Sequence, residues 1–395
     1  MIKVLTNSFG KPLMNQQGKV YGVPVEAPEN DVNFYDFDGF RVASYSKSDF
    51  ANLTALPANP THTGLTAQGW NWALADAKTF VAQYGSLDIG QNYITSDGKT
   101  RIYIEIEKSF TNFAHNLSLK QSVTNGVTID WGDGSATETF SGTTQTNVPH
   151  TYATGGSYVI TFDVAEGCVL TIGVPAGNIG CFGNTNKNRL YPTLKNIELG
   201  TRLLNIGSYC CDISTQYFSN QLETITVPAN MNLGVNSFYG CGRLKFLVIP
   251  SGETNLPNFC FTQCIYTKVS LPKSVDIIGT SAVAYNHEYL VIILPPSITT
   301  IGNTAFRDWW QLVKITVPNT ISSIGNNCFQ NCYGLKEFHI EATTPPSLGA
   351  TAFSGYPSDF RIYVPRSENQ TVLNEYKSAT NWNAFASIIE EEPLT

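Results

Sequence analysis

Two short stretches of the chain carry residues that could bind a metal or take part in redox chemistry. In "IGNNCFQNCYGLKEFHI", Cys328 and Cys332 are four residues apart and His339 follows seven residues later. "CFTQCIY" repeats the first spacing at Cys260 and Cys264. Thiolates and imidazoles are the usual ligands of structural zinc, which needs four of them at about 2.0–2.3 Å from the ion. Whether these residues meet depends on the elements that carry them.

Those elements belong to a repeat that begins near residue 200. The dipeptide Ile-Gly, or a variant of it, recurs from Ile206 to Leu348 at intervals of 27, 23, 22, 23, 23 and 24 residues. Glu341 takes the place of a proline that follows a short apolar strand in five earlier repeats, at Pro228, Pro250, Pro272, Pro295 and Pro318. A period of about 20–29 residues is typical of a solenoid, in which each unit buries its apolar face against its neighbours.

Each unit is expected to contain Ile-Gly, a turn with an aromatic residue, and then a strand. In "LVKITVP", Leu312, Ile315 and Val317 are predicted to point inward, and the residues between them outward. The proline lacks a backbone donor, so it is expected to end the strand.

This frame places the cysteines in columns. Cys260 and Cys328 come directly before the turn aromatic, where other repeats have serine or alanine. They are three rungs apart, which is about 14 Å at the usual strand spacing of about 4.7–4.9 Å. His339 is expected on the outward side of its strand. We therefore expect no zinc site and no cofactor, and we expect the cysteines to act as small apolar side chains.

A second inward column contains Cys241, Cys264 and Cys332. Cys241 and Cys264 lie on adjacent rungs, a separation that overlaps the range a disulfide allows. Buried thiols are favoured over a disulfide for this pair, but both alternatives stay open.

The repeats "SSIGNNCFQNCYGLKEFHI" and "TTIGNTAFRDWWQLVKITVPNTI" resemble the BspA-like leucine-rich repeats of bacterial surface proteins, over roughly residues 176–390. The tail "IYVPRSENQTVLNEYKSATNWNAFASIIEEE" resembles the terminal cap of that family, with a last strand at 362–364, a helix near 373–376 and a segment at 382–389. The resemblance implies a β-rich solenoid at 176–360 and a cap at 361–395.

Two further modules precede the repeats. "GVTIDWGDGSATETF" and "PHTYATGGSYVITFDV" resemble a polycystic-kidney-disease (PKD) like β-sandwich at 109–175, which in that family is a spacer or adhesive module. Ile129 and Trp131 are expected to point inward, before a turn at Asp133-Gly134.

The first 108 residues are predicted to form an arm (1–30) and a mixed α+β module (31–108). "VNFYDFDGFRVASYS" predicts two strands around Asp38-Gly39, and "WNWALADAKTFVAQYG" a helix that Gly85 ends. "KTRIYIEIE" alternates as a strand. The stretch from Leu56 to Ile106 resembles a module of repeat proteins from gut bacteria and their phages. The fold class is thus mainly β and multidomain.

Other candidate chemistry is weak. Asp36 and Asp38 lack the later ligands of a calcium loop, and Asp130 and Asp133 flank a turn, so turns are favoured at both places. No GxSxG or SxxK motif is present, and the five histidines are scattered among the modules. We expect no enzymatic activity, although a triad assembled only in space is an alternative.

The outward face of the solenoid strands is more informative. Repeats of this family usually carry Thr, Ser and Lys there, whereas this chain has an apolar patch, and an exposed apolar patch commonly marks an interface. Trp310, Tyr333 and His287 are expected to rim the face as binding anchors. The alternative is that another part of the chain, such as the PKD-like module, covers the patch. Besides Trp310 and Tyr333, the candidate binding residues are Phe246, Val248, Leu290, Val291, Ile293, Val313 and His339.

These features predict a non-enzymatic binding or structural protein. The formal net charge of −7 argues against a nucleic-acid partner, and no apolar run is long enough for membrane insertion. "MIKVLTNSFGKPLMNQQGKVYGV" shows no secretion signal and looks like the start of a phage structural protein. We expect a virion component (fibre, tail or capsid-attached) that contacts other virion proteins or a host surface protein or glycan. A bacterial surface adhesin, a homo-oligomer and an accessory part of a glycan-active enzyme are alternatives.

Overall fold

The computed structural model describes residues 2–4, 22–24, 31–172, 193–201, 203–206, 222–228, 231–265, 267–287 and 291–393. The chain is mainly β, and none of the helices in these ranges is long and apolar enough to span a membrane. Within the predicted arm, β1 (Ile2–Val4) pairs antiparallel with β2 (Gly22–Pro24). The rest of that prediction lies outside the described residues.

The first module is a four-stranded sheet with two helices. Both the predicted hairpin around Asp38-Gly39 and the predicted helix are confirmed, and the helix ends at Gly85 with φ of 91°. Phe34, Trp72 and Phe80 are buried in the core of this module. Its elements are β3 (Val32–Tyr35), β4 (Arg41–Tyr45), α1 (Lys47–Ala51), β5 (Leu65–Trp70), α2 (Leu74–Tyr84) and β6 (Leu87–Thr95), with the strand order β4-β3-β6-β5.

The predicted boundary at 108/109 is wrong, because a single strand, β7 (Thr100–Gln121), runs through it. β7 pairs along most of its length with β10 (Thr146–Val164). The strand predicted at "KTRIYIEIE" is confirmed, and Ile102, Ile104 and Ile106 are buried in the core that continues through the repeats rather than in that of the first module. The first module therefore ends at about Thr95. The remaining strands here are β8 (Val127–Asp130), β9 (Glu138–Phe140) and β11 (Leu170–Ile172).

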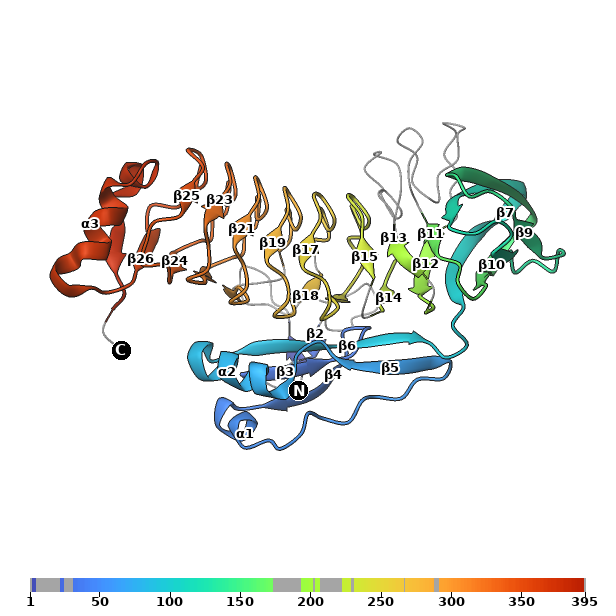
Figure 1. Cartoon of the computed structure of the whole chain (residues 1–395), viewed down its shortest axis with the longest axis horizontal. Coiled ribbons are helices and arrows are strands. Elements are labelled where there is room, and N and C mark those ends of the chain that lie inside the picture. Colours follow the sequence, from blue (N-terminus) through green and yellow to red (C-terminus); the bar gives the residue numbers. More distant parts are fainter. Residues whose placement is uncertain are drawn as a thin grey trace.

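The repeats form two rows of short parallel strands (Figure 1). The Ile-Gly pairs end a second strand in each unit, which the sequence reading missed. One row consists of β12 (Thr193–Glu198), β14 (Thr224–Thr226), β16 (Phe246–Val248), β18 (Lys268–Ser270), β20 (Val291–Ile293), β22 (Lys314–Val317), β24 (Glu337–Ile340) and β26 (Arg361–Val364). The other consists of β13 (Leu203–Ile206), β15 (Asn232–Leu233), β17 (Asn255–Leu256), β19 (Ile277–Ile278), β21 (Thr300–Ile301), β23 (Ser323–Ile324) and β25 (Ser347–Leu348).

Close backbone stacking explains the glycines at Gly279, Gly302, Gly325 and Gly349. A Cβ at Gly302 would lie 2.6 Å from the carbonyl carbon of Gly279 in the preceding rung, and one at Gly325 would lie 2.5 Å from the backbone nitrogen of Asn303. No other residue fits without moving the rungs apart. The turn aromatics stack in the same direction, with 5.4 Å between the ring centroids of Phe306 and Phe329.

Both ends of the solenoid are capped. β7 pairs with β11 near its carboxyl end and with β12 near its amino end, so this one strand begins both rows. At the other end, the predicted cap is present as β26, η1 (Glu368–Gln370), α3 (Thr371–Ser378), η2 (Trp382–Phe385) and β27 (Ile389–Glu391). Such caps cover the apolar ends that a solenoid would otherwise expose.

Candidate functional site

The candidate binding face is the outward side of the row from β16 to β26. The predicted alternation is confirmed at β22, where Ile315 and Val317 of the strand and Leu312 just before it are fully buried in the solenoid core. The residues between them point away from that core. Parallel pairing then aligns equivalent outward residues on successive rungs, such as Phe246 with Lys268 and Val248 with Ser270.

The first module covers much of this face (Figure 1). Phe246 is 1% exposed and packs on Tyr35, with ring centroids 4.9 Å apart. Val248 is 4% exposed and lies against Gly90 so closely that a Cβ at Gly90 would come within 2.6 Å of Val248 Cγ2. Phe246 and Val248 are therefore not available to a partner. The chain itself covers them, as the alternative predicted, but the covering part is the first module and not the PKD-like one.

Buried polar contacts fix this module on the strands. The side-chain amide of Asn71 donates to the carbonyl of Ile249 at 3.2 Å and to the carbonyl of Ser270 at 3.1 Å. Trp72 Nε1 donates to the carbonyl of Leu271 at 2.9 Å, and Ser270 Oγ donates to the carbonyl of Asp88 at 2.8 Å. These bonds satisfy backbone groups that the packing removes from water.

A second anchor lies at the end of α2. The hydroxyl of Tyr84 donates to Glu341 at 2.7 Å, and burial together with this carboxylate raises the pKa of Tyr84. Glu341 replaces the proline of the earlier repeats, so the break in that column coincides with a contact to the first module. At the other end of α2, Asp76 forms an ion pair with Lys273 at 2.6 Å.

The other predicted apolar residues divide into two groups. Ile293 packs against the core of the first module, so it too is covered by the chain. Val291 is 50% exposed and Val313 is half-buried. Leu290 lies outside the described residues. Contact of Val291 and Val313 with a partner stays a prediction.

Three aromatic side chains occupy equivalent turn positions on successive rungs, and we call His287, Trp310 and Tyr333 the aromatic row. Trp310 is 52% and Tyr333 is 59% exposed. His287 stacks on Trp310, with centroids 4.6 Å apart and an interplanar angle of 20°. The row thus presents flat apolar surfaces to solvent along the direction of the repeat.

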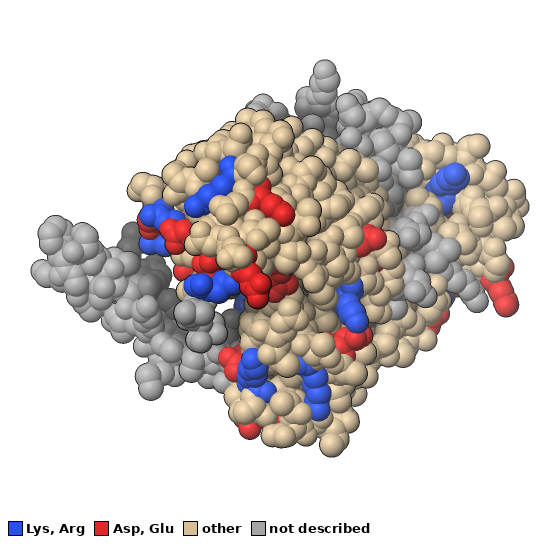
Figure 2. All heavy atoms as spheres, turned by 60° about the vertical axis from the view of Figure 1, so that its left-hand side comes forward, with Lys and Arg blue, Asp and Glu red and all other residues tan. Residues whose placement is uncertain are grey.

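Beyond β20 the outward face carries charges of alternating sign. The register aligns Lys314, Glu337 and Arg361 on successive strands. It also places Glu390 opposite Tyr363, which is two residues after Arg361. Lys314 and Glu337 approach to 3.2 Å, and Arg361 and Glu390 to 3.1 Å. Figure 2 shows basic and acidic side chains side by side on this part of the surface. The face is therefore locally balanced rather than a patch of one charge.

His339 is buried, which corrects its predicted role as an exposed contact residue. Its ring stacks on Tyr363 at 4.7 Å. Nδ1 lies 2.7 Å from Glu392 and Nε2 lies 3.0 Å from Glu337. The histidine connects β24 to the residues after β27, and its position outside the solenoid core separates it from Cys328 and Cys332, as predicted.

The cysteines of the described repeats are buried, and none of them, Cys241 and Cys264 included, forms a disulfide. The second inward column has a role that the sequence reading missed, because its side chains donate to carbonyls of the preceding rung. Cys332 Sγ lies 3.2 Å from the carbonyl of Phe306, and Trp309 Nε1 donates to the carbonyl of Val283 at 2.7 Å. Among the described residues there is no cluster of three or more side chains suited to a metal.

Comparison with known proteins identifies the repeats. Residues 190–288 and 211–336 match the model of the BspA type leucine-rich repeat region, in six copies. The match covers less than half of the chain and includes neither the first module nor the β7–β10 sheet. No curated protein matches the chain.

Several solved structures are similar over part of the chain. A leucine-rich repeat protein from Bacteroides ovatus has 16% identity and a TM-score of 0.32, with 48% of this chain and 55% of that one covered. The pneumococcal vaccine antigen PcpA has 23% identity and a TM-score of 0.33, with 42% and 40% covered. The T. pallidum leucine-rich repeat protein has 17% identity and a TM-score of 0.31, with 46% and 78% covered. The alignment thus covers about half the length of the first two proteins.

Proposed function

We propose that this chain, whose residues 190–336 are BspA-type leucine-rich repeats, is a non-enzymatic binding protein that contacts its partner through the aromatic row. The exposure of Trp310 and Tyr333 supports this proposal, because aromatic side chains dominate the energy of many interfaces. The first module already occupies the strand face up to Ile293. Among the described residues of the predicted surface, the aromatic row, Val291 and Val313 stay available to a protein or glycan partner.

Two settings fit such a protein. The stretch "MIKVLTNSFGKPLMNQQGKVYGV" resembles part of phage structural proteins, which supports a role as a fibre, tail or capsid-attached virion component. Its BspA-type repeats support the alternative, an adhesin on a bacterial surface. Mass spectrometry of purified particles and of cell envelopes distinguishes them. Stoichiometric amounts in particles support the virion, and presence in envelopes alone contradicts it.

The binding role is tested with the fluorescently labelled protein on a panel of intact gut-bacterial cells. We expect the double variant Trp310→Ala/Tyr333→Ala to lose at least about tenfold in affinity for a strain that binds the parent. Its melting temperature should stay near that of the parent, because both side chains are exposed. Phe40→Ala, which removes a 69% exposed aromatic in the first module, is the control and should bind normally. Unchanged binding by the double variant contradicts the proposal.

A further inference from the structure

The row of strands that the first module covers is interrupted between β18 and β20, which do not pair with each other. β18 pairs with β16, and β20 pairs with β22, so the two pairs belong to different sheets. The opposite row continues through the same rungs from β17 to β25. Three inward residues at this division are only partly buried, namely Val269, Leu271 and Ile292. The residues that pair with Val269 and Ile292 on the flanking rungs, Leu247 and Ile315, are buried.

The column of turn aromatics is also interrupted next to this division, at Val283. Phe238 stacks on Phe261, and Phe306 stacks on Phe329. Between these pairs the column holds Val283, a smaller residue. The missing ring and the divided sheet together leave room inside the solenoid.

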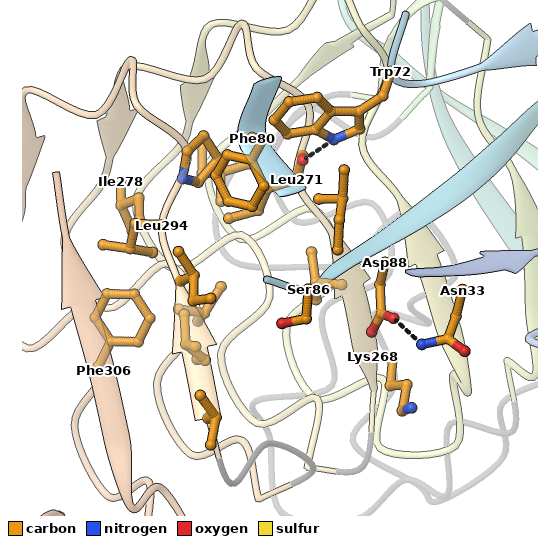
Figure 3. A pocket seen from close by; sticks show the side chains of 18 of the residues that line it. Asn33, Trp72, Phe80, Ser86, Asp88, Lys268, Leu271, Ile278, Leu294 and Phe306 are labelled. Carbon is orange, nitrogen blue, oxygen red and sulfur yellow. Dashed lines mark hydrogen bonds between the residues drawn. The ribbon is translucent and has the colours of Figure 1, made fainter. Parts of the chain in front are cut away.

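A cavity of about 490 Å³ occupies this room. That volume is within the range of about 300–1,000 Å³ that is typical of small-molecule sites. Core side chains form its deep end, among them Ile278, Leu294 and Phe306, and α2 contributes Phe80 (Figure 3). The indole N–H groups of Trp72 and Trp309 donate to backbone carbonyls, so the deep end presents hydrocarbon surface.

The mouth of the cavity is polar and carries both signs of charge. Ser86, Asp88 and Lys268 lie together at the other side of Figure 3. Asp88 accepts a hydrogen bond from Asn33 at 3.3 Å, and Lys268 donates to the hydroxyl of Tyr35 at 3.2 Å. A carboxylate on the ligand would be attracted by Lys268 but repelled by Asp88, and an ammonium would be attracted by Asp88 but repelled by Lys268. A hydroxyl group can donate to Asp88 and accept from Lys268 without either repulsion.

We propose that this cavity binds an uncharged amphipathic small molecule, with its apolar body against Val283 and Phe306 and a hydroxyl group near Asp88 and Lys268. Burial of the apolar body drives binding, because moving hydrocarbon surface from water to the apolar part of the lining is favourable. The site needs residues of both the first module and the repeats. It is separate from the aromatic row and does not depend on the binding role proposed above.

The probe is 1-octanol, titrated into the full chain by calorimetry and by tryptophan fluorescence, to which Trp72 and Trp309 in the lining contribute, with octanoate and octylamine as charged analogues. We expect saturable binding of one octanol per chain, at least about tenfold tighter than either analogue. Val283→Phe restores the aromatic found in the other repeats and should abolish binding without lowering the melting temperature. Val123→Phe, the same change at an exposed site, should leave affinity unchanged.

Three results overturn the proposal. They are the absence of saturable octanol binding, binding by Val283→Phe as tight as that of the parent, and equal affinity for octanol and a charged analogue. If Val283→Phe does not fold, Val283→Leu adds one methylene to the same cavity. An affinity for octanol several-fold below that of the parent then supports the site, and an unchanged affinity contradicts it.

Discussion

The side chain of Asn71 lies within 3.0 Å of Ser270 Oγ, although 199 residues separate the two in sequence. Both residues are buried. This contact is the centre of the interface between the first module and the repeats, since the Asn71 amide also reaches the carbonyls of Ile249 and Ser270. Solenoids commonly use their extended strand surface to bind other molecules, and here part of that surface contacts a module of the same chain.

Removal of this amide should weaken the interface. Asn71→Ala removes the side-chain donor to the carbonyl of Ile249 and the acceptor of the backbone N–H of Gly90, both in a buried place, so we expect the free energy of unfolding to fall by about 1–3 kcal/mol. Urea unfolding measures the loss, and hydrogen exchange should show faster exchange in β18. Asn59→Ala, at an exposed position of the same module, should change neither. An equal effect of the two substitutions contradicts a specific role for Asn71.

Close packing makes Gly90 sensitive to a single methyl group. In Gly90→Ala the new Cβ would lie 2.6 Å from Val248 Cγ2 and 2.8 Å from Cγ1, so we expect a loss of about 1–3 kcal/mol in unfolding free energy from overpacking. Gly242→Ala is the matched control, because its Cβ would meet nothing closer than 3.7 Å. Urea unfolding compares the two variants.

A double-mutant cycle makes that test specific. Val248→Ala removes both methyl groups that the new Cβ would contact, so Gly90→Ala should cost much less in that background. If the cost is the same with and without the Val248 methyl groups, Gly90 does not act through this contact.

The solenoid was predictable from sequence because every unit repeats the same pattern of buried and turn residues. The Ile-Gly column, the strand-ending prolines and the inward alternation of residues such as Ile315 each recur at one period. The cap after Val364 was predictable for the same reason. The boundary at 108/109 was not, because the alternation of Ile102 to Ile106 identifies a strand but not the core into which it points. The sequence shows that Val283 replaces an aromatic residue in the column of turn aromatics. It does not show that this smaller side chain lines a cavity, because the cavity also depends on the interruption of the sheet between β18 and β20.

The candidate site was predictable only in part. An apolar residue at an outward position predicts that something covers it, but the sequence does not show which element does so. Phe246 and Val248 are covered by residues about 160 to 210 positions earlier, and no local pattern links Tyr35 or Gly90 to them. Glu341 carried a signal, since it interrupts the proline column where Tyr84 binds. Trp310 and Tyr333 keep their exposed positions because no element of the first module reaches them in the described structure.

The turn at Asp133 should make stability depend on pH. Burial alone would raise the pKa of this carboxyl, but hydrogen bonds from Ser135 and His150 outweigh burial and lower the pKa from 3.8 to about 2. A pKa that is lower in the folded state means that the carboxylate stabilises the fold above about pH 4 and that this contribution is lost as the pH falls towards about 2.

Asp133→Asn should therefore lower the unfolding free energy by on the order of 1–2 kcal/mol at neutral pH. The difference between this variant and the parent should shrink between about pH 4 and pH 2. Urea unfolding at several pH values measures it, and Asp38→Asn at another turn is the control. A difference that is the same at every pH shows that the charge of Asp133 does not contribute.

The repeat thiols should be unreactive in the folded protein. Burial raises the pKa of Cys332 to about 12 and raises the pKa of Cys260 and Cys328 well above 9.0, and only thiolates react readily. Iodoacetamide labelling followed by peptide mass spectrometry should find these three unmodified in buffer and modified in urea. It should also recover Cys241 and Cys264 without a disulfide. Labelling in buffer, or a disulfide-linked peptide, contradicts the buried free thiols.

The central claim is that the first module packs on the outer strand face of the repeats. Making the same substitution at two outward valines tests this claim most directly. Val248 is 4% exposed beneath the module and Val291 is 50% exposed. Because a buried carboxylate without a partner is costly, Val248→Asp should lower the free energy of unfolding by about 3 kcal/mol or more, and Val291→Asp by less than about 1 kcal/mol. Equal, small losses in urea unfolding would show that the face is open to solvent and would contradict the docked arrangement.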